Sequence, residues 1–151
     1  MLGNDAFVAE DLLQLDSPAE IHRVVKEMLQ RVCAYTGEKK RNKSLLLAKQ
    51  AARYIDEHYS DKIKVEDIAN AVYLSSGYLM TVFKKEIGMS VISYLRMRRM
   101  EKAKELLLDK KLKIYEVAER VGYESTNFFS ATFRDYVGLS PKQFKDKNLQ
   151  K

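Results

Sequence analysis

Apolar positions at helical spacing form two similar blocks, at residues 63–94 and 112–144 of the chain. In the second block they share one face of an expected helix: Ile114, Val117, Ala118 and Val121. This spacing predicts a short helix that ends at Gly122. Ser125 is placed to cap a second helix, which Gly138 ends. A short helix, a glycine turn and a second helix are typical of a helix-turn-helix unit.

The second helix of this unit is expected to be amphipathic. Phe129, Thr132 and Phe133 fall on its buried face, and small or polar residues occupy the opposite face. Beyond the glycine, Ser140 and Pro141 start a further helix, with the hydroxyl as N-cap and the proline at the first helical position. The block therefore predicts three helices, the middle one with a polar outer face.

The first block repeats the pattern of the second. At an offset of 49 positions, Ile63, Val65, Ile68 and Ala69 match Leu112, Ile114, Val117 and Ala118. Beyond the turn the offset is 50, and Phe83, Gly88, Ser90 and Tyr94 match Phe133, Gly138, Ser140 and Phe144. The one-residue slip falls in the turn, where an insertion costs least. Two copies are too few for a solenoid, so the repeat predicts a pair of similar binding modules.

A capping box at residues 17–20 is expected to start an N-terminal helix. Its apolar stripe consists of Ile21, Val24, Val25, Met28, Leu29 and Val32. Such a stripe needs a partner, and packing within the chain and pairing in a homodimer are both open. The sequence predicts that this helix ends at 36–37, that 38–44 form a basic linker, and that a helix over 45–59 follows. The expected domains are therefore 1–44 and 45–151.

A long helix over residues 91–108, capped by Ser90, is expected between the modules. Its apolar positions can face both modules: Ile92, Leu95, Met100, Ala103, Leu106 and Leu107. The predicted fold is thus all-α, with two helix-turn-helix subdomains at about 63–88 and 114–137. They are joined by this linker helix and preceded by an N-terminal helical segment.

The spacing of many of these residues resembles the DNA-binding domain of the AraC/XylS family of bacterial transcription regulators. The resemblance covers roughly residues 48–146. Its most specific positions are Val117-Ala118, Val121-Gly122-Tyr123, Phe128-Phe129, Phe133-Arg134, Gly138-Leu139-Ser140-Pro141 and Phe144-Lys145. It implies binding of double-stranded promoter DNA, regulation of transcription, and contact of an exposed surface with RNA polymerase. Family members generally carry a sensor or receiver domain, which 1–44 is too short to form, so a fragment of a larger regulator is favoured over a short stand-alone member.

Charge is unevenly distributed along the chain. The formal net charge is +6, but residues 1–35 contain six acids and three bases, so they contribute −3 and the remainder contributes +9. A basic region that coincides with the repeated modules suits the DNA backbone, because lysine and arginine displace its counterions. The chain has no apolar run long enough for a membrane span and no signal segment. The single Cys33 allows no internal disulfide and no zinc cluster, which indicates a reduced, cytoplasmic location.

The resemblance places the outer faces of two recognition helices in the major groove. In the first, which should run over 76–87, the outer residues are Ser76, Gly77, Met80, Thr81, Lys84 and Lys85. In the second they are Ser125, Thr126, Asn127, Ser130, Ala131 and Arg134. Asn127 can pair with an adenine edge, and Thr81 and Ala131 offer methyl groups to thymine. Family members often carry arginine at these last two positions, so the resemblance implies here a readout that is A·T-directed or shape-based.

The basic residues of these faces, Lys84, Lys85 and Arg134, suit phosphates better than bases, and Ser125 marks a helix N-terminus that can bind another phosphate. Several of the selected residues also have structural interpretations. Ser76 and Ser125 can act only as helix caps, and Arg99 is better explained as an anchor between subdomains than as a base contact. Tyr94, Tyr123, Phe128 and Phe144 are expected in the core, and Cys33 as an inert, partly buried thiol.

Two other classes of function compete with DNA binding. A protein-interaction module with the same fold is supported by the lack of arginine at positions 81 and 131 of the outer faces and opposed by the positive charge. An enzyme has no support, because the sequence lacks paired carboxylates, a nucleophile with a histidine, a phosphate-binding glycine loop and metal-ligand spacing. No cofactor or metal is expected.

Overall fold

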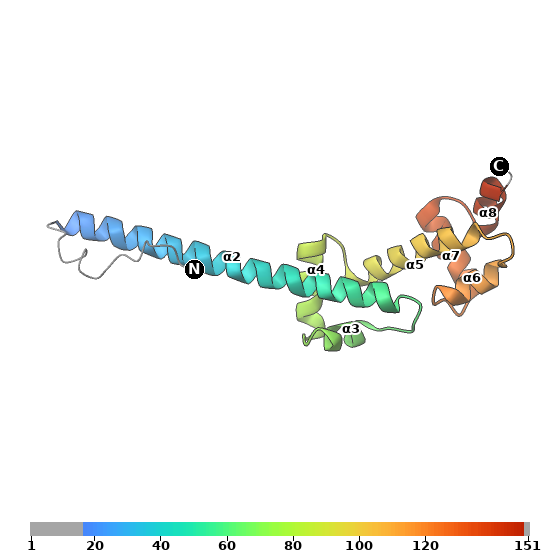
Figure 1. Cartoon of the computed structure of the whole chain (residues 1–151), viewed down its shortest axis with the longest axis horizontal. Coiled ribbons are helices and arrows are strands. Elements are labelled where there is room, and N and C mark those ends of the chain that lie inside the picture. Colours follow the sequence, from blue (N-terminus) through green and yellow to red (C-terminus); the bar gives the residue numbers. More distant parts are fainter. Residues whose placement is uncertain (1–16, 150–151) are drawn as a thin grey trace. The chain divides into compact units, whose positions relative to one another are not determined.

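The computed structural model describes residues 17–149, and within this range it contains helices and no strand. The helices are α2 (Pro18–His58), α3 (Val65–Ala71), α4 (Ser76–Ile87), α5 (Val91–Leu107), α6 (Ile114–Arg120), α7 (Thr126–Val137) and α8 (Pro141–Leu149) (Figure 1). The all-α prediction is confirmed. Residues 1–16 of the expected N-terminal domain lie outside the described residues. The chain divides into two units, residues 1–43 and 44–151.

The N-terminal helix does not end where the sequence predicted. Helix α2 continues through Thr36-Gly37 and through the expected linker over 38–44, as far as His58. A single glycine costs a helix only about 1 kcal/mol relative to alanine, and the lysines and arginines that follow are good helix formers. The Thr36 hydroxyl bonds to the Val32 carbonyl oxygen at 2.9 Å, within the helix. A basic, polar composition therefore did not interrupt the helix.

In the first unit, the start of α2 is as predicted and most of its apolar stripe is uncovered. The Ser17 hydroxyl accepts a hydrogen bond from the Glu20 backbone N–H at 3.2 Å. Val24 is buried, Met28 is half-buried, and the remaining stripe residues are exposed: Ile21, Val25, Leu29 and Val32. Cys33 is also exposed, so the expectation of a partly buried thiol was wrong.

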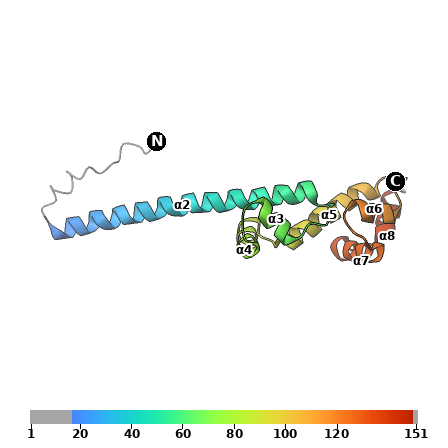
Figure 2. The same ribbon diagram turned by 90° about the horizontal axis from the view of Figure 1, so that it is seen from below.

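The second unit contains two hydrophobic cores, one for each helix-turn-helix module. The first core joins the end of α2 to α3, α4 and the start of α5, and includes Ala51, Ala52, Ile55, Ile68, Ala69, Val72, Leu79, Phe83 and Val91. The second joins the remainder of α5 to α6 and α7: Met100, Ala103, Leu107, Leu112, Val117, Ala118, Val121, Phe129 and Phe133. Figure 2 shows α5 leading from the first group of helices to the second. The repeated sequence pattern thus becomes two repeated cores.

Helix α5 lies close to its predicted bounds, and it is about 25 Å long at 1.5 Å per residue. Met100, Ala103 and Leu107 are buried as expected, and Leu95 and Leu106 pack against the cores. Ile92 was expected to face a module but is 59% exposed. Val91 is buried instead, and successive helical residues point about 100° apart, so its neighbour turns outward.

Candidate nucleic-acid interface

Helix α4 is the second helix of the first module, and its exposed face is the expected first recognition surface. Ser75 caps this helix, since its hydroxyl accepts a hydrogen bond from the Tyr78 backbone N–H at 3.3 Å. Ser76 is therefore the first helical residue and not the cap. Leu79, Val82 and Phe83 are buried. With that face inward, the opposite face is presented to solvent.

The exposed face of α4 contains the residues selected from the sequence. Gly77, Met80, Thr81, Lys84 and Lys85 are exposed, and Ser76 is half-buried. The Thr81 hydroxyl donates to the Gly77 carbonyl oxygen at 3.0 Å, so its proton is engaged with the helix backbone. A methyl contact is then the interaction that this threonine can offer most readily to a base.

Helix α7 occupies the same place in the second module. Ser125 caps it, and its hydroxyl accepts from the Phe128 backbone N–H at 3.3 Å. The buried residues are Phe129, Thr132 and Phe133, as predicted. On the other side Ser125, Asn127, Ala131 and Arg134 are exposed, and Thr126 and Ser130 are half-buried. Both sets of selected residues therefore lie together on outward faces of equivalent helices.

Two aromatic residues on these helices were placed wrongly or missed. Phe128 was expected in the core but is 65% exposed, and its ring lies beside that of Tyr123, with 5.9 Å between the centroids. At the matching position of α4, Tyr78 is 47% exposed. The neighbouring positions Leu79 and Phe129 fill the cores, so the preceding residue on each helix is displaced toward solvent. The 50-residue offset pairs Tyr78 with Phe128 and could have identified both.

The other aromatic predictions agree with the structure. Tyr94 packs against the first core, and Tyr123 and Phe144 pack against the second. Phe83 and Tyr94 meet edge to face with centroids 5.5 Å apart, and Phe133 and Phe144 repeat this contact at the same distance and interplanar angle. These pairs fix the helix after each recognition helix against its module.

Helices α4 and α7 differ in charge. The last turn of α4 contains Lys84 and Lys85, whereas the matching positions of α7 are Arg134 and Asp135. Lys85 is 3.7 Å from Glu86, a distance that leaves its ammonium available to other anions. The first module therefore offers more positive charge for phosphate contacts.

The described part of the chain contains neither a candidate metal site nor a candidate membrane span. Residues 17–149 contain no cluster of three or more His, Cys, Asp or Glu side chains able to hold a metal ion. None of the helices in this range combines the length and apolar character that crossing a membrane requires.

Comparison with known proteins identifies the fold. A helix-turn-helix domain family model matches residues 68–147. The regulatory protein PocR of Salmonella typhimurium is 35% identical over 99 residues, which are 66% of this chain and 33% of PocR. The chain spans 26 to 47% of the length of the named relatives that it matches, among them an Msm operon regulatory protein of Streptococcus mutans and a xylose operon regulatory protein of Escherichia coli.

Solved structures agree. The C-terminal domain of AraT, a response regulator from Geobacillus stearothermophilus, is 40% identical with a TM-score of 0.65, and the match covers 67% of this chain and 84% of that domain. The DNA-binding domain of AdpA, a global transcriptional factor solved in complex with a target DNA, is 25% identical with a TM-score of 0.63, over 66% of this chain and 90% of that domain. The chain belongs to the AraC family of helix-turn-helix transcription regulators and contains their DNA-binding domain.

Proposed function

We propose that residues 44–151 bind promoter DNA by inserting α4 and α7 into successive major grooves on one side of the duplex, and thereby regulate transcription. The observation that supports this is the pair of exposed, equivalent helix faces on two modules that one continuous helix joins. Recognition helices that enter successive grooves must stand about 34 Å apart, one turn of DNA. Helix α5, about 25 Å long, is of the right order to separate them.

Base recognition is assigned to the exposed side chains near the start of each recognition helix. Asn127 can donate to and accept from an adenine edge in the major groove. Thr81, Ala131 and Met80 offer apolar contacts, which suit the thymine methyl group. A Cβ at Gly77 would meet nothing of the protein within 4 Å, so the glycine leaves room for close approach of DNA to the backbone.

Phosphate contacts are assigned to the helix ends. Lys84, Lys85 and Arg134 lie exposed in the last turns of α4 and α7. Ser76, Ser125, Thr126 and Ser130 flank the base-contacting residues and are short enough for hydrogen bonds to phosphate oxygens. Exposed Tyr78 and Phe128 join the same two faces. With few charged base contacts, target selection relies on A·T content and DNA shape.

The exposed apolar stripe of α2 supports a homodimer. Ile21, Val25, Met28, Val32 and Tyr35 follow one another at intervals of 4, 3, 4 and 3 residues, the heptad spacing of a coiled coil. Most of them are exposed, so pairing with the same helix of a second copy would remove apolar surface from water. We further propose that the regulator acts in the cytoplasm and contacts RNA polymerase through an exposed surface of the first module or of α5, without catalytic activity of its own.

An alternative is a protein-interaction module, which the exposed Tyr78, Met80 and Phe128 favour. Selection of bound fragments from genomic DNA, followed by gel-shift titration at several salt concentrations, separates the two functions. Promoter binding predicts an enriched sequence and an affinity that falls steeply with salt. No enrichment, or an affinity independent of salt, would refute DNA recognition and favour the protein-interaction module.

A further inference from the structure

Arg99 of α5 bonds to the loop between α2 and α3. Its Nε donates to the Tyr59 carbonyl oxygen at 2.7 Å, and its Nη2 donates to the Asp61 carbonyl oxygen at 2.8 Å. The guanidinium also lies over the ring of Tyr123, 5.3 Å from its centroid. The loop leads from α2 into α3 of the first module, and both Tyr59 and Tyr123 pack against the core of the second. One side chain therefore joins both modules to the helix between them.

The turn of the second module touches the same loop through Gly122. A Cβ on Gly122 would stand 2.8 Å from the Ser60 carbonyl oxygen and 2.9 Å from Nη2 of Arg99. The matching turn position of the first module is Tyr73, which also has a left-handed backbone (φ 56°) but is 96% exposed. The turn conformation by itself thus tolerates a side chain. The glycine at 122 is required by the close contact with the loop.

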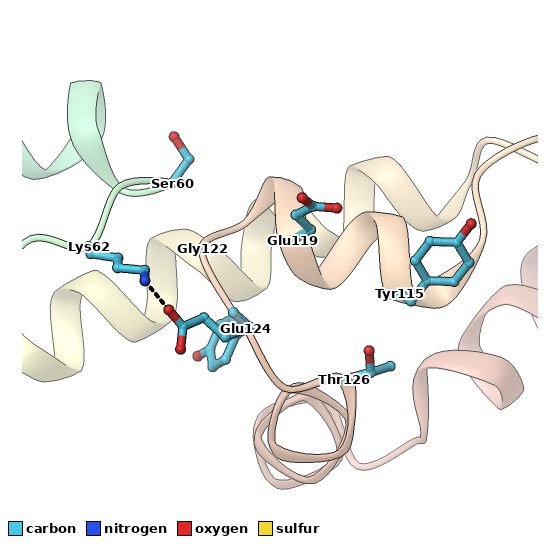
Figure 3. Close-up of a pocket in the computed structure, with 8 residues that line it drawn as sticks. Ser60, Lys62, Tyr115, Glu119, Gly122, Glu124 and Thr126 are labelled. Atoms are coloured by element: carbon cyan, nitrogen blue, oxygen red, sulfur yellow. Dashed lines mark ion pairs between the residues drawn. The ribbon is translucent and has the colours of Figure 1, made fainter.

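An ion pair crosses the same junction. Lys62 of the loop pairs with Glu124, two residues beyond Gly122, as Figure 3 shows. This contact raises the pKa of Lys62 and lowers that of Glu124, each through their shared hydrogen bond. Both side chains are largely exposed, so the pair contributes little to stability. The pair is a further contact between the same loop and the same turn that Arg99 and Gly122 bring together.

Arg99 lies in the part of α5 that leads from the first core to the second. Val91 belongs to the first core and Leu95 packs against it, whereas Met100 is the first α5 residue of the second core. Arg99 stands at that transition. Here α5 also contacts the end of α2 through the Arg98–Asp56 ion pair, with Nε 2.6 Å from Oδ1. A bend of α5 at this point would move α7 relative to α4.

We propose that Arg99 is a positioning residue: with Gly122 and the Lys62–Glu124 pair, it forms a latch that fixes the distance and the rotational phase between α4 and α7. The chain then accepts one spacing of its two half-sites on DNA. This inference rests on the proposed two-groove binding. Its physical content, a restricted geometry of the two modules, can be measured without DNA.

The DNA test uses the duplex that the wild-type chain selects from a randomised library, together with copies that have one base pair inserted or deleted between the half-sites. One base pair shifts a half-site by about 3.4 Å and about 34°. Wild type should lose at least about tenfold in affinity on the altered duplexes. Arg99→Met should bind the original duplex about tenfold more weakly, because fewer molecules have the geometry that fits it. Its affinities for the three spacings should differ by less than about threefold, because its modules are no longer held at one distance.

Two further variants separate positioning from charge. Arg99→Lys keeps the positive charge but cannot make two directed bonds and a ring contact together, so it should behave like Arg99→Met. Arg53→Met removes a charge from an exposed position of α2 and should keep the wild-type dependence on spacing. Wild-type spacing dependence in Arg99→Lys, or the same loss of spacing dependence in Arg53→Met, would refute the proposed role of Arg99.

The DNA-free test measures the distance between two spin labels by pulsed electron paramagnetic resonance. The labels are placed at Lys85→Cys and Asp135→Cys, matching exposed positions of α4 and α7, in a Cys33→Ser background. The distance distribution should be narrow with Arg99 and broader with Arg99→Met or Arg99→Lys, at unchanged helix content. An equally narrow distribution in both variants would refute the inference even if DNA binding holds. If the wild-type chain selects no duplex, the proposed function is refuted. The label distances still test whether Arg99 restricts the geometry of the two modules.

Discussion

Ser44 donates a hydrogen bond of 2.7 Å from its hydroxyl to Oε1 of Glu86, and so ties helix α2 to the C-terminal turn of recognition helix α4. Ser44 is buried, and the Glu86 side chain is only 10% exposed. A carboxylate in such a place needs donors, because water reaches it poorly. This bond connects the helix that enters from the first unit to the helix that is proposed to enter DNA.

Replacing Ser44 with alanine should lower the free energy of unfolding by about 1–3 kcal/mol, since a nearly buried carboxylate loses a donor. Urea denaturation followed by circular dichroism measures this loss. Glu86→Gln keeps an acceptor without the charge and should cost less. In a double-mutant cycle the two changes should be non-additive; additive losses would show that the hydrogen bond does not couple these residues.

Substitutions at the matching turn positions 73 and 122 should change the free energy of unfolding differently. Tyr73→Gly relieves a left-handed residue that costs about 1–2 kcal/mol, offset by about 0.5–1 kcal/mol of added chain entropy, so stability should stay equal or rise slightly. Gly122→Ala should lose about 2–4 kcal/mol, from the same backbone preference and from overlap with the Ser60 carbonyl oxygen. Urea denaturation of both variants provides the comparison. Equal losses would contradict the difference in their surroundings.

Asn127→Ala should weaken binding to the selected duplex by about 1–3 kcal/mol and relax the preference at one base position. Titration against duplexes substituted at each position in turn measures both effects. The matched control is Asp135→Asn, an exposed position near the other end of α7, which should leave base preference unchanged. If Asn127→Ala weakened binding equally on every sequence, a base contact would be excluded.

Lys84→Gln and Arg134→Gln should weaken binding to all sequences alike. Each lost phosphate contact should reduce the slope of log affinity against log salt by about 0.9. Gel-shift titrations over a range of salt concentrations determine the slope. Lys110→Gln, an exposed position between α5 and α6, provides a control for the loss of one charge. A changed base preference with an unchanged salt slope would reassign these residues to base contact.

Val32→Asp should weaken self-association of the chain by more than about tenfold, because a dimer would bury an unpaired carboxylate. Sedimentation at increasing protein concentration measures the dimer fraction. Gln30→Asp adds the same charge outside the heptad positions and should leave the dimer intact. Should wild type remain monomeric at all concentrations, or should both variants dissociate equally, the heptad interface would be wrong.

Much of the fold could be predicted because the pattern is local and duplicated. Helix α4 has its predicted bounds, and the buried faces of α4 and α7 are those expected from apolar spacing. The failures lie where a residue's neighbours come from elsewhere or where two local signals compete. Thr36-Gly37 looked like a helix end, but the residues beyond it are good helix formers. Phe128 looked like core, but Phe129 occupies that core.

The sequence by itself determined the all-α fold, the two modules and the outward set of residues on each recognition helix, because helical periodicity and glycine or serine at helix ends act over a few residues. Only the tertiary structure decided which backbone atoms Arg99 meets and why glycine is required at 122 but not at 73. Each of these depends on contacts across tens of residues, such as Arg99 with the Tyr59 carbonyl oxygen. Neither residue type nor spacing along the chain specifies which backbone atoms such a side chain will meet.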